Sequence, residues 1–319
     1  MKDIYVVVTM DCERPTSETH ARASGPPDYA AAEVWTRAYA ETAAQYGFPV
    51  TFFLHPEVAL AQTDLFLELE GQGACLGLHV HPWRFTDGRY GAELGGLPEA
   101  EGRAVLSEAV ALWRHAFGRR PLYFRPGAMS ANDSTYRILT DLGFRGGAVS
   151  MPGRVFPDIH AIWAGAAPDP HRAHRFFRQL EGDLEFANMP SSVDFSTLLE
   201  KNGRWFHWDL RPDFDLDHHT VAARIVSQVL ARDPAVPVVN MVTHNDHDFA
   251  DASDPTCSGY HSVLSGIVDA CTAAGLRAVG TTLEEVCYLV LAQPPVSQEL
   301  NVASGKVMFD EGELREFSL

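Results

Sequence analysis

Segments with strand-like and helix-like patterns alternate along most of this chain, and that alternation constrains its fold more than any other feature. Short apolar runs predict strands over residues 4–9, 50–54, 75–79, 122–124, 205–210, 236–242 and 277–280, with a shorter one near residue 148. Helical spacing of apolar residues predicts helices over residues 29–46, 64–72, 98–117, 133–142, 219–231, 260–274 and 282–291. Repeated strand–helix units imply a parallel sheet with covering helices, and about seven of them favour an α/β fold of the distorted (β/α)7-barrel type.

A single domain accounts for most of the chain. The sequence has 319 residues and is 46% hydrophobic, which is enough for one large core. Residues 151–204 interrupt the alternation and are rich in proline, histidine and phenylalanine, which predicts an irregular insert. We therefore expect a barrel over residues 1–293 with its insert at about 151–204, followed by a peripheral tail over residues 294–319.

Two histidines close the third predicted strand. His79-Val80-His81 ends a buried apolar run and is followed by Pro82 and Trp83. Side chains two apart on a strand point to the same face, so both imidazoles can project together. Such a pair offers a divalent transition metal two of the nitrogen ligands it prefers.

An acidic pair follows the first predicted strand. Asp11 and Glu13 are two residues apart, so their carboxylates can share one cavity. Zinc sites for hydrolysis commonly take three protein ligands and leave a position for water, whose pKa the metal lowers toward about 7. One carboxylate can then bind the metal while the other accepts a proton from that water.

A late histidine completes the candidate site. His244 is the first ionisable residue after the apolar run over residues 236–242, where it can protonate a leaving amine or stabilise developing negative charge. His247 is either a fourth ligand or, as we expect, a loop residue. Five polar residues lie at the carboxyl ends of the predicted strands, where the active sites of such barrels collect: Asp11, His79, Arg125, Asp209 and His244.

Charge and composition limit the partners. The net charge is −17 and the chain has three lysines, which argues against nucleic acid or an anionic membrane as its main partner and favours a neutral or locally recognised substrate. No apolar run reaches the roughly 20 residues of a membrane span, and the N-terminus shows no leader pattern. Five scattered cysteines are expected to be reduced thiols, so we expect a cytoplasmic protein.

These motifs together resemble the polysaccharide deacetylases, the NodB-like group of carbohydrate esterase family 4. The resemblance extends over about residues 4–290 and consists of six motifs in the family's order: Thr9-Met10-Asp11-Cys12-Glu13, Val50-Thr51-Phe52-Phe53-Leu54, His79-Val80-His81-Pro82-Trp83, Phe124-Arg125-Pro126-Gly127-Ala128, Val242-Thr243-His244 and Gly280-Thr281-Thr282-Leu283-Glu284-Glu285. A subgroup with the His-x-His-Pro-Trp pattern is the most similar to this chain.

The resemblance implies a divalent metal held by one carboxylate and two histidines, and hydrolysis of an N-acetyl or related acyl group on a sugar or glycan precursor by a metal-activated water. Asp11 matches the family's catalytic base and His244 its general acid. His79 and His81 match the histidine ligands, and either Glu13 or Asp11 supplies the carboxylate ligand. Zinc is the expected metal, with cobalt, iron, nickel or manganese as alternatives.

The resemblance also implies a set of substrate-binding residues. Arg125 would brace Asp11, with Asp209 as its own partner. The backbone N–H of Ala128 would polarise the acyl oxygen, and Trp83 would either stack on a sugar ring or fill the barrel mouth. The oligomeric state stays open.

The chain departs from the family's pattern in two places. Cys12 occupies the position of the usual second aspartate, so we expect Glu13 to replace that ligand, with a Cys12 thiolate as the alternative. The two histidines are two residues apart instead of four. Two other functions stay open: a deformylase or other amide hydrolase acting on a small modified sugar, and a carbohydrate-binding barrel without catalysis. An amidohydrolase is disfavoured because its His-x-His lies on the first strand, and a cupin because it is all-β.

Overall fold

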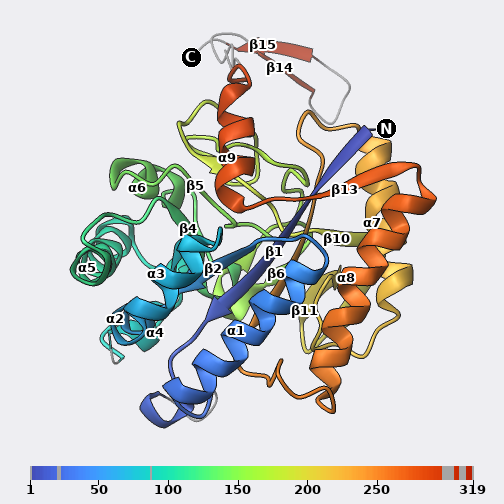
Figure 1. The fold of residues 1–319 in the computed structure, drawn as a ribbon. Coiled ribbons are helices and arrows are strands. Elements are labelled where there is room, and N and C mark those ends of the chain that lie inside the picture. Colours follow the sequence, from blue (N-terminus) through green and yellow to red (C-terminus); the bar gives the residue numbers. More distant parts are fainter. Residues whose placement is uncertain (1, 20–22, 87, 297–304, 309–313, 318–319) are drawn as a thin grey trace.

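A curled sheet of nine strands lies at the centre of this computed structural model, which describes residues 2–19, 23–86, 88–296, 305–308 and 314–317 (Figure 1). Eight strands are paired side by side in the order β12 (Val238–His244), β1 (Lys2–Cys12), β2 (Val50–Leu54), β3 (Cys75–Val80), β4 (Tyr123–Pro126), β5 (Gly146–Gly147), β9 (Ala187–Asn188) and β8 (His171–Arg172). The ninth, β13 (Leu276–Gly280), pairs with the first half of β1. The pairs are parallel except β8 with β9.

Helices surround this sheet (Figure 1). They are α1 (Tyr29–Gln45), α2 (Pro56–Ala61), α3 (Thr63–Gly71), α4 (Pro82–Phe85), α5 (Glu99–Phe117), α6 (Thr135–Asp141), α7 (His218–Arg232), α8 (Pro255–Ala273) and α9 (Leu283–Ala292). Their starts follow from local sequence: Asp28, Asp217 and Asp254 each accept a backbone N–H at the first turn of α1, α7 and α8. The predicted α/β class and distorted barrel are confirmed, while α2 and α4 were not predicted.

The strands have two buried faces, and each face belongs to a different core. On β1, Val6, Val8 and Met10 pack outward in the large core cluster that includes the helices. Val7 points the other way, into a smaller cluster that includes Phe53 of β2 and side chains of α9. This alternation is the two-residue period of a strand. Side chains of α9 therefore pack against the inner face of the curled sheet, and the cavity lies at the carboxyl ends of the strands.

The curled sheet is not closed by a strand ladder. In the described part of the chain the outermost strands, β8 and β12, do not pair with one another. Asn240 of β12 spans this seam: its Nδ2 donates to the carbonyl of Pro190 at 2.6 Å, and its backbone N–H donates to Oγ of Ser192 at 2.9 Å. Nearby, the Val242 N–H donates to the Leu210 carbonyl at 3.2 Å. Hydrogen bonds of the Asn240 and Ser192 side chains, and not a regular strand ladder, therefore join the two sides of this seam.

Residues 151–204 contain loops and mostly short strands. Four strands form a second sheet in the order β10 (Val193–Lys201), β11 (Arg204–Asp209), β6 (Val155–Phe156) and β7 (Ala161–Ile162). The predicted strand over residues 205–210 is therefore real, but it belongs to this antiparallel sheet and not to the barrel. The short strands β8 and β9 join the main sheet instead, so the segment supplies part of the barrel wall.

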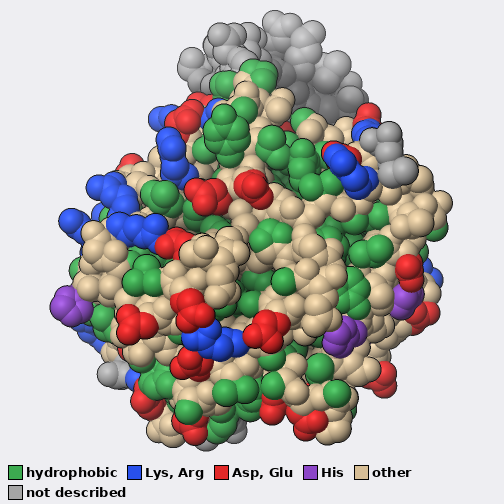
Figure 2. Space-filling model, viewed as in Figure 1, with side chains coloured by type: hydrophobic (Ala, Val, Ile, Leu, Met, Phe, Trp, Pro, Cys, Tyr) green, Lys and Arg blue, Asp and Glu red, His purple; other side chains and the backbone are tan. Residues whose placement is uncertain are grey.

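The remaining features concern the surface and the tail. Acidic, basic and hydrophobic side chains are interspersed over the face shown in Figure 2. Among the residues described, none of the helices is both long and apolar enough to cross a membrane.

All five cysteines are buried and free. Of the predicted tail over 294–319, strands β14 (Gly305–Met308) and β15 (Leu314–Phe317) pair antiparallel, and residues 297–304, 309–313 and 318–319 lie outside the described part.

Candidate metal and catalytic site

The end of β1 presents Asp11 and Glu13 on one face and Cys12 on the other. Asp11 and Glu13 line the large cavity at the carboxyl ends of the strands. Cys12 packs with the outer core and has no exposed surface. Burial, together with the neighbouring carboxylates, raises the pKa of the Cys12 thiol well above its ordinary value. This geometry favours Glu13 over a Cys12 thiolate as the third ligand.

Glu13, His79 and His81 converge on one point. Oε1 of Glu13 lies 3.1 Å from Nε2 of His79 and 3.1 Å from Nε2 of His81. One ligand atom from each residue lies within 4.8 Å of the others, and all three residues are buried. Within the residues that the structure describes, this is the one such cluster of potential metal ligands.

Neighbouring acceptors orient the two imidazoles. Nδ1 of His79 donates to the carbonyl of Arg125 at 3.1 Å, and Nδ1 of His81 lies 2.7 Å from Oε1 of Glu93. With Nδ1 engaged, each ring directs Nε2 toward Glu13, which is the arrangement that metal-binding histidines commonly adopt. Two imidazole nitrogens and one carboxylate oxygen therefore fit a divalent transition metal.

The pKa values of His81 and Glu13 also indicate a site that favours a cation. Burial acts to lower the pKa of His81, but Glu93 and Glu13 outweigh it and raise that pKa to about 10. Burial acts to raise the pKa of Glu13, but His81 and His79 hold it well below its ordinary value. The cluster therefore keeps a positive charge beside its carboxylates. A bound cation supplies such a charge when it displaces the protons from its ligands.

Two residues that the sequence analysis missed hold Glu13 in place. Nη1 of Arg84 lies 2.8 Å from Oε2 of Glu13, which leaves Oε1 facing the histidines. The backbone N–H of Glu13 donates to Oδ1 of Asn245 at 2.8 Å, and the backbone N–H of Asn245 donates to the Asp11 carbonyl at 3.1 Å. Asn245 therefore fastens the end of β1 to the end of β12.

Arg125 braces Asp11, as the resemblance implied. Nη1 of Arg125 lies 2.7 Å from Oδ1 of Asp11, and Nη2 donates to Oγ1 of Thr9 at 2.9 Å. The guanidinium is completely buried and lies over the ring of Phe53. Burial acts to raise the pKa of Asp11, but Arg125 outweighs it, so that pKa is lowered and the carboxylate stays ionised at neutral pH.

Asp209 does not partner Arg125, contrary to the prediction. It lies at the end of β11 in the second sheet, and its Oδ2 is 2.9 Å from Nη2 of Arg211. The expected pairing failed because β11 is not a barrel strand, so Asp209 reaches the cavity from the opposite wall. His244, by contrast, is the register partner of Asp11 on the neighbouring strand, which places both residues at the same edge of the sheet.

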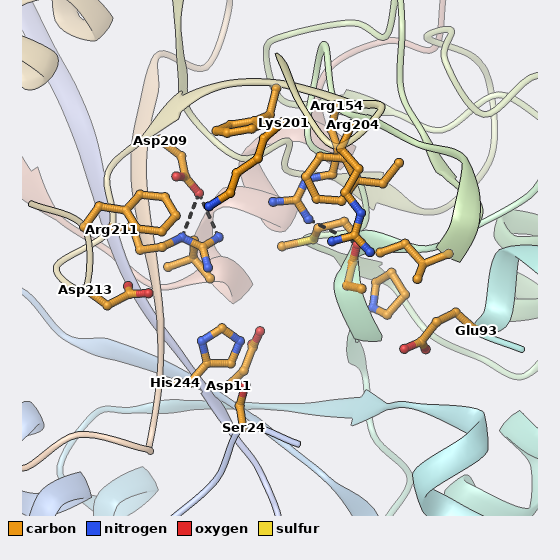
Figure 3. A pocket seen from close by; sticks show the side chains of 18 of the residues that line it. Asp11, Ser24, Glu93, Arg154, Lys201, Arg204, Asp209, Arg211, Asp213 and His244 are labelled. Carbon is orange, nitrogen blue, oxygen red and sulfur yellow. Dashed lines mark hydrogen bonds and ion pairs between the residues drawn. The ribbon is translucent and has the colours of Figure 1, made fainter. Parts of the chain in front are cut away.

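The cavity over these residues has a volume of about 1320 Å³ (Figure 3). Asp11 and His244 lie together on one side, and Lys201, Arg204 and Asp209 extend from the second sheet on the other. The cavity is lined by the predicted site residues Asp11, Glu13, His79, His81, Trp83, Ala128, Asp209 and His244. Arg125 lies behind Asp11 and does not line it, and His247 contacts Thr256 instead.

The turn after β4 is shaped to fit against His81. A Cβ atom at Gly127 would lie 2.2 Å from Nδ1 of His81, so only glycine allows this approach. Ala128 and Met129 follow with φ values of 52° and 55°, in the left-handed region that non-glycine residues seldom adopt. Strain of this kind is concentrated at functional sites. Trp83 lines the cavity beside this turn and donates its indole N–H to Oε1 of Glu93 at 2.8 Å.

Glu93 is the third residue that the sequence analysis missed. It lies in a loop over which glycine and aromatic residues gave no periodic signal, and nothing in its sequence context distinguishes it from other surface acids. Metal-binding histidines commonly have a carboxylate partner, so a nearby acid could have been expected, but the sequence does not show which acid it is.

A family model matches part of the chain. Residues 25–147 match the family described as polysaccharide deacetylase. That range includes His79, His81, Arg125 and Ala128, while Asp11 and Glu13 precede it and His244 follows it. No curated protein matches the chain.

Solved structures share the fold. A candidate polysaccharide deacetylase from Mycobacterium smegmatis superposes with a TM-score of 0.53 and 15% identity, covering 93% of this chain and 94% of that one. A probable polysaccharide deacetylase from Pseudomonas aeruginosa PAO1 gives 0.54 and 12%, covering 92% and 93%. The PuuE allantoinase gives 0.55 and 12%, covering 92% of both chains. The chain therefore matches the polysaccharide deacetylase family model over residues 25–147 and shares its fold with these solved structures.

Proposed function

We propose that this protein is a metal-dependent hydrolase that removes an N-acetyl or similar acyl group from a sugar or glycan precursor. The observation that carries the proposal is the convergence of Glu13, His79 and His81 in the same cavity as the Arg125-braced Asp11 and His244. If these three residues served only the stability of the fold, their imidazoles and carboxylate would not need to meet inside a cavity.

Glu13, His79 and His81 would hold the metal. A bound zinc, cobalt, iron, nickel or manganese ion would polarise the acyl oxygen and lower the pKa of water to about 7. Arg84 would keep Glu13 in place, and Glu93 would fix the His81 ring. These contacts matter because a loosely held ligand set loses geometry and affinity.

Asp11 and His244 would move the protons. Asp11 accepts a proton from the attacking water through the carboxylate that Arg125 orients. His244, opposite Asp11 on the neighbouring strand, donates a proton to the departing amine. The backbone N–H of Ala128 would donate to the acyl oxygen as negative charge develops there.

The lining of the cavity is suited to a sugar ring. Trp83, Phe156 and Trp208 line it and provide flat apolar surfaces, and polar side chains lie among them. The fold alone leaves the acyl group open, because the structural relatives include proteins named as deacetylases and one named as an allantoinase.

Metal content measured by mass spectrometry tests the proposal. The wild type is compared with a His79→Ala/His81→Ala double variant and with a His219→Ala/His261→Ala double variant, which removes two histidines outside the cluster. We expect one metal per chain in the wild type and in the second variant, and none in the first. Acetate and formate release from N-acetyl and N-formyl sugars then separates a deacetylase from a deformylase. Absence of metal from the reconstituted wild type would refute the proposal and favour a carbohydrate-binding barrel.

A further inference from the structure

Arg154 is a cavity cation with few partners. It lies directly before β6, in the second sheet, and its half-buried side chain lines the cavity (Figure 3). Nη1 donates to the carbonyl of Ala128 at 3.2 Å, and Nε is buried without a hydrogen-bond partner. A guanidinium has five N–H donors, so most of its capacity is unused.

The other arginines that line the cavity are each paired with a carboxylate. Arg84 pairs with Glu13, Arg204 with Asp158, and Arg211 with Asp209. Within the described ranges, Arg154 forms no ion pair. It shares one aromatic ring with Arg204: the two guanidinium carbons lie 4.7 Å and 4.9 Å from the centroid of Phe156. Arg154 and Arg204 therefore occupy similar surroundings and differ in whether an acid compensates the charge.

The pKa of Arg154 also reflects the lack of a carboxylate partner. Burial, followed by the nearby Arg211, lowers the pKa of Arg154 to about 10, and Asp209 offsets only part of this effect. A charge that is partly withdrawn from water without a partner is costly, and an anion from a ligand would offset the cost. Arginine suits this task because its planar fork binds carboxylates and phosphates through two parallel hydrogen bonds.

We propose that the substrate is an N-acylated sugar bearing a carboxylate or phosphate group and that Arg154 binds that group. The inference rests on the proposed function and narrows its substrate class. Because Arg154 contacts the Ala128 turn, which packs against His81, the anion would lie on the same side of the cavity as the metal ligands. The net charge of −17 alone favours a neutral substrate, but a local unpaired cation outweighs distant charges that salt screens.

The experiment compares three substrates: N-acetylglucosamine, N-acetylglucosamine 6-phosphate and N-acetylmuramic acid. We expect kcat/KM for one of the two charged sugars to exceed that of the neutral one by roughly 10- to 100-fold, the scale of a charge-assisted hydrogen-bond pair. Arg154→Gln should abolish this preference, mainly through KM, and Arg154→Lys should restore part of it. Arg204→Gln is the matched control and should retain the preference. The phosphate and carboxylate arms show which anion is bound.

Two results would overturn the inference. One is a wild type that hydrolyses the neutral sugar as well as the charged ones. The other is an Arg154→Gln variant that loses activity equally on all three, which would mean that Arg154 only supports the Ala128 turn. If none of the sugars is hydrolysed, the proposed function fails, and calorimetric binding of the same sugars to the wild type and Arg154→Gln tests the inference separately. The inference is supported if the wild type, but not Arg154→Gln, binds a charged sugar more tightly than N-acetylglucosamine. Equal affinities of the wild type for the charged and neutral sugars refute it.

Discussion

Replacing Glu93 with glutamine should weaken metal binding without removing a ligand. Oε1 of Glu93 accepts hydrogen bonds from Nδ1 of His81 at 2.7 Å and from Nε1 of Trp83 at 2.8 Å. The carboxylate thus fixes the His81 ring and increases the basicity of its Nε2. Glutamine is nearly isosteric and can still accept one hydrogen bond, but it carries no charge. The change therefore tests how strongly metal affinity depends on the charge of Glu93, which contacts the ligand His81 but is not itself a ligand.

The expected loss of metal affinity is on the order of 10- to 100-fold, which corresponds to about 1.4–2.8 kcal/mol, as for carboxylate partners of metal-bound histidines in general. Competition with a chelator of known affinity measures it directly. Glu57→Gln is the matched control, because Oε2 of Glu57 lies 2.6 Å from Nδ1 of His55, a histidine outside the ligand cluster. Unchanged affinity in Glu93→Gln, or an equal loss in Glu57→Gln, would refute the reasoning.

Three further predictions concern the site and the seam. His244→Ala should retain metal but lose about 10²- to 10⁴-fold in kcat, the usual contribution of a general acid; loss of metal would instead make His244 a ligand. Gly127→Ala should displace His81 and lower metal content, because its Cβ would lie 2.2 Å from the ring, whereas Gly71→Ala, with nothing within 4 Å, should have no effect. Asn240→Ala should lower the free energy of unfolding by about 1–3 kcal/mol in urea titrations, because buried partners across the seam lose their hydrogen bonds; a change below about 0.5 kcal/mol would mean that the seam does not depend on them.

Periodicity located most of the barrel. The strand over 50–54 and the helix over 29–46 agree with β2 and α1 to within one residue, because a fully buried apolar strand and a helix with one buried face both give clear patterns. The same rules misassigned the strand over 205–210 to the barrel. A half-buried strand has the same pattern in either sheet, and its partner is set by contacts far away in the chain.

The sequence by itself determined which side chains share a face. Asp11 with Glu13, and His79 with His81, are two apart on strands, so the strand period alone places each pair together. Only the tertiary structure decided how those pairs combine. In the folded protein, Cys12 packs in the outer core and Asp209 forms an ion pair with Arg211. Three further residues contact the cluster of Glu13, His79 and His81: Glu93, Arg84 and Asn245. These contacts join residues from separate loops and strands, and local pattern carries no information about which distant groups a curled sheet will bring within hydrogen-bonding distance.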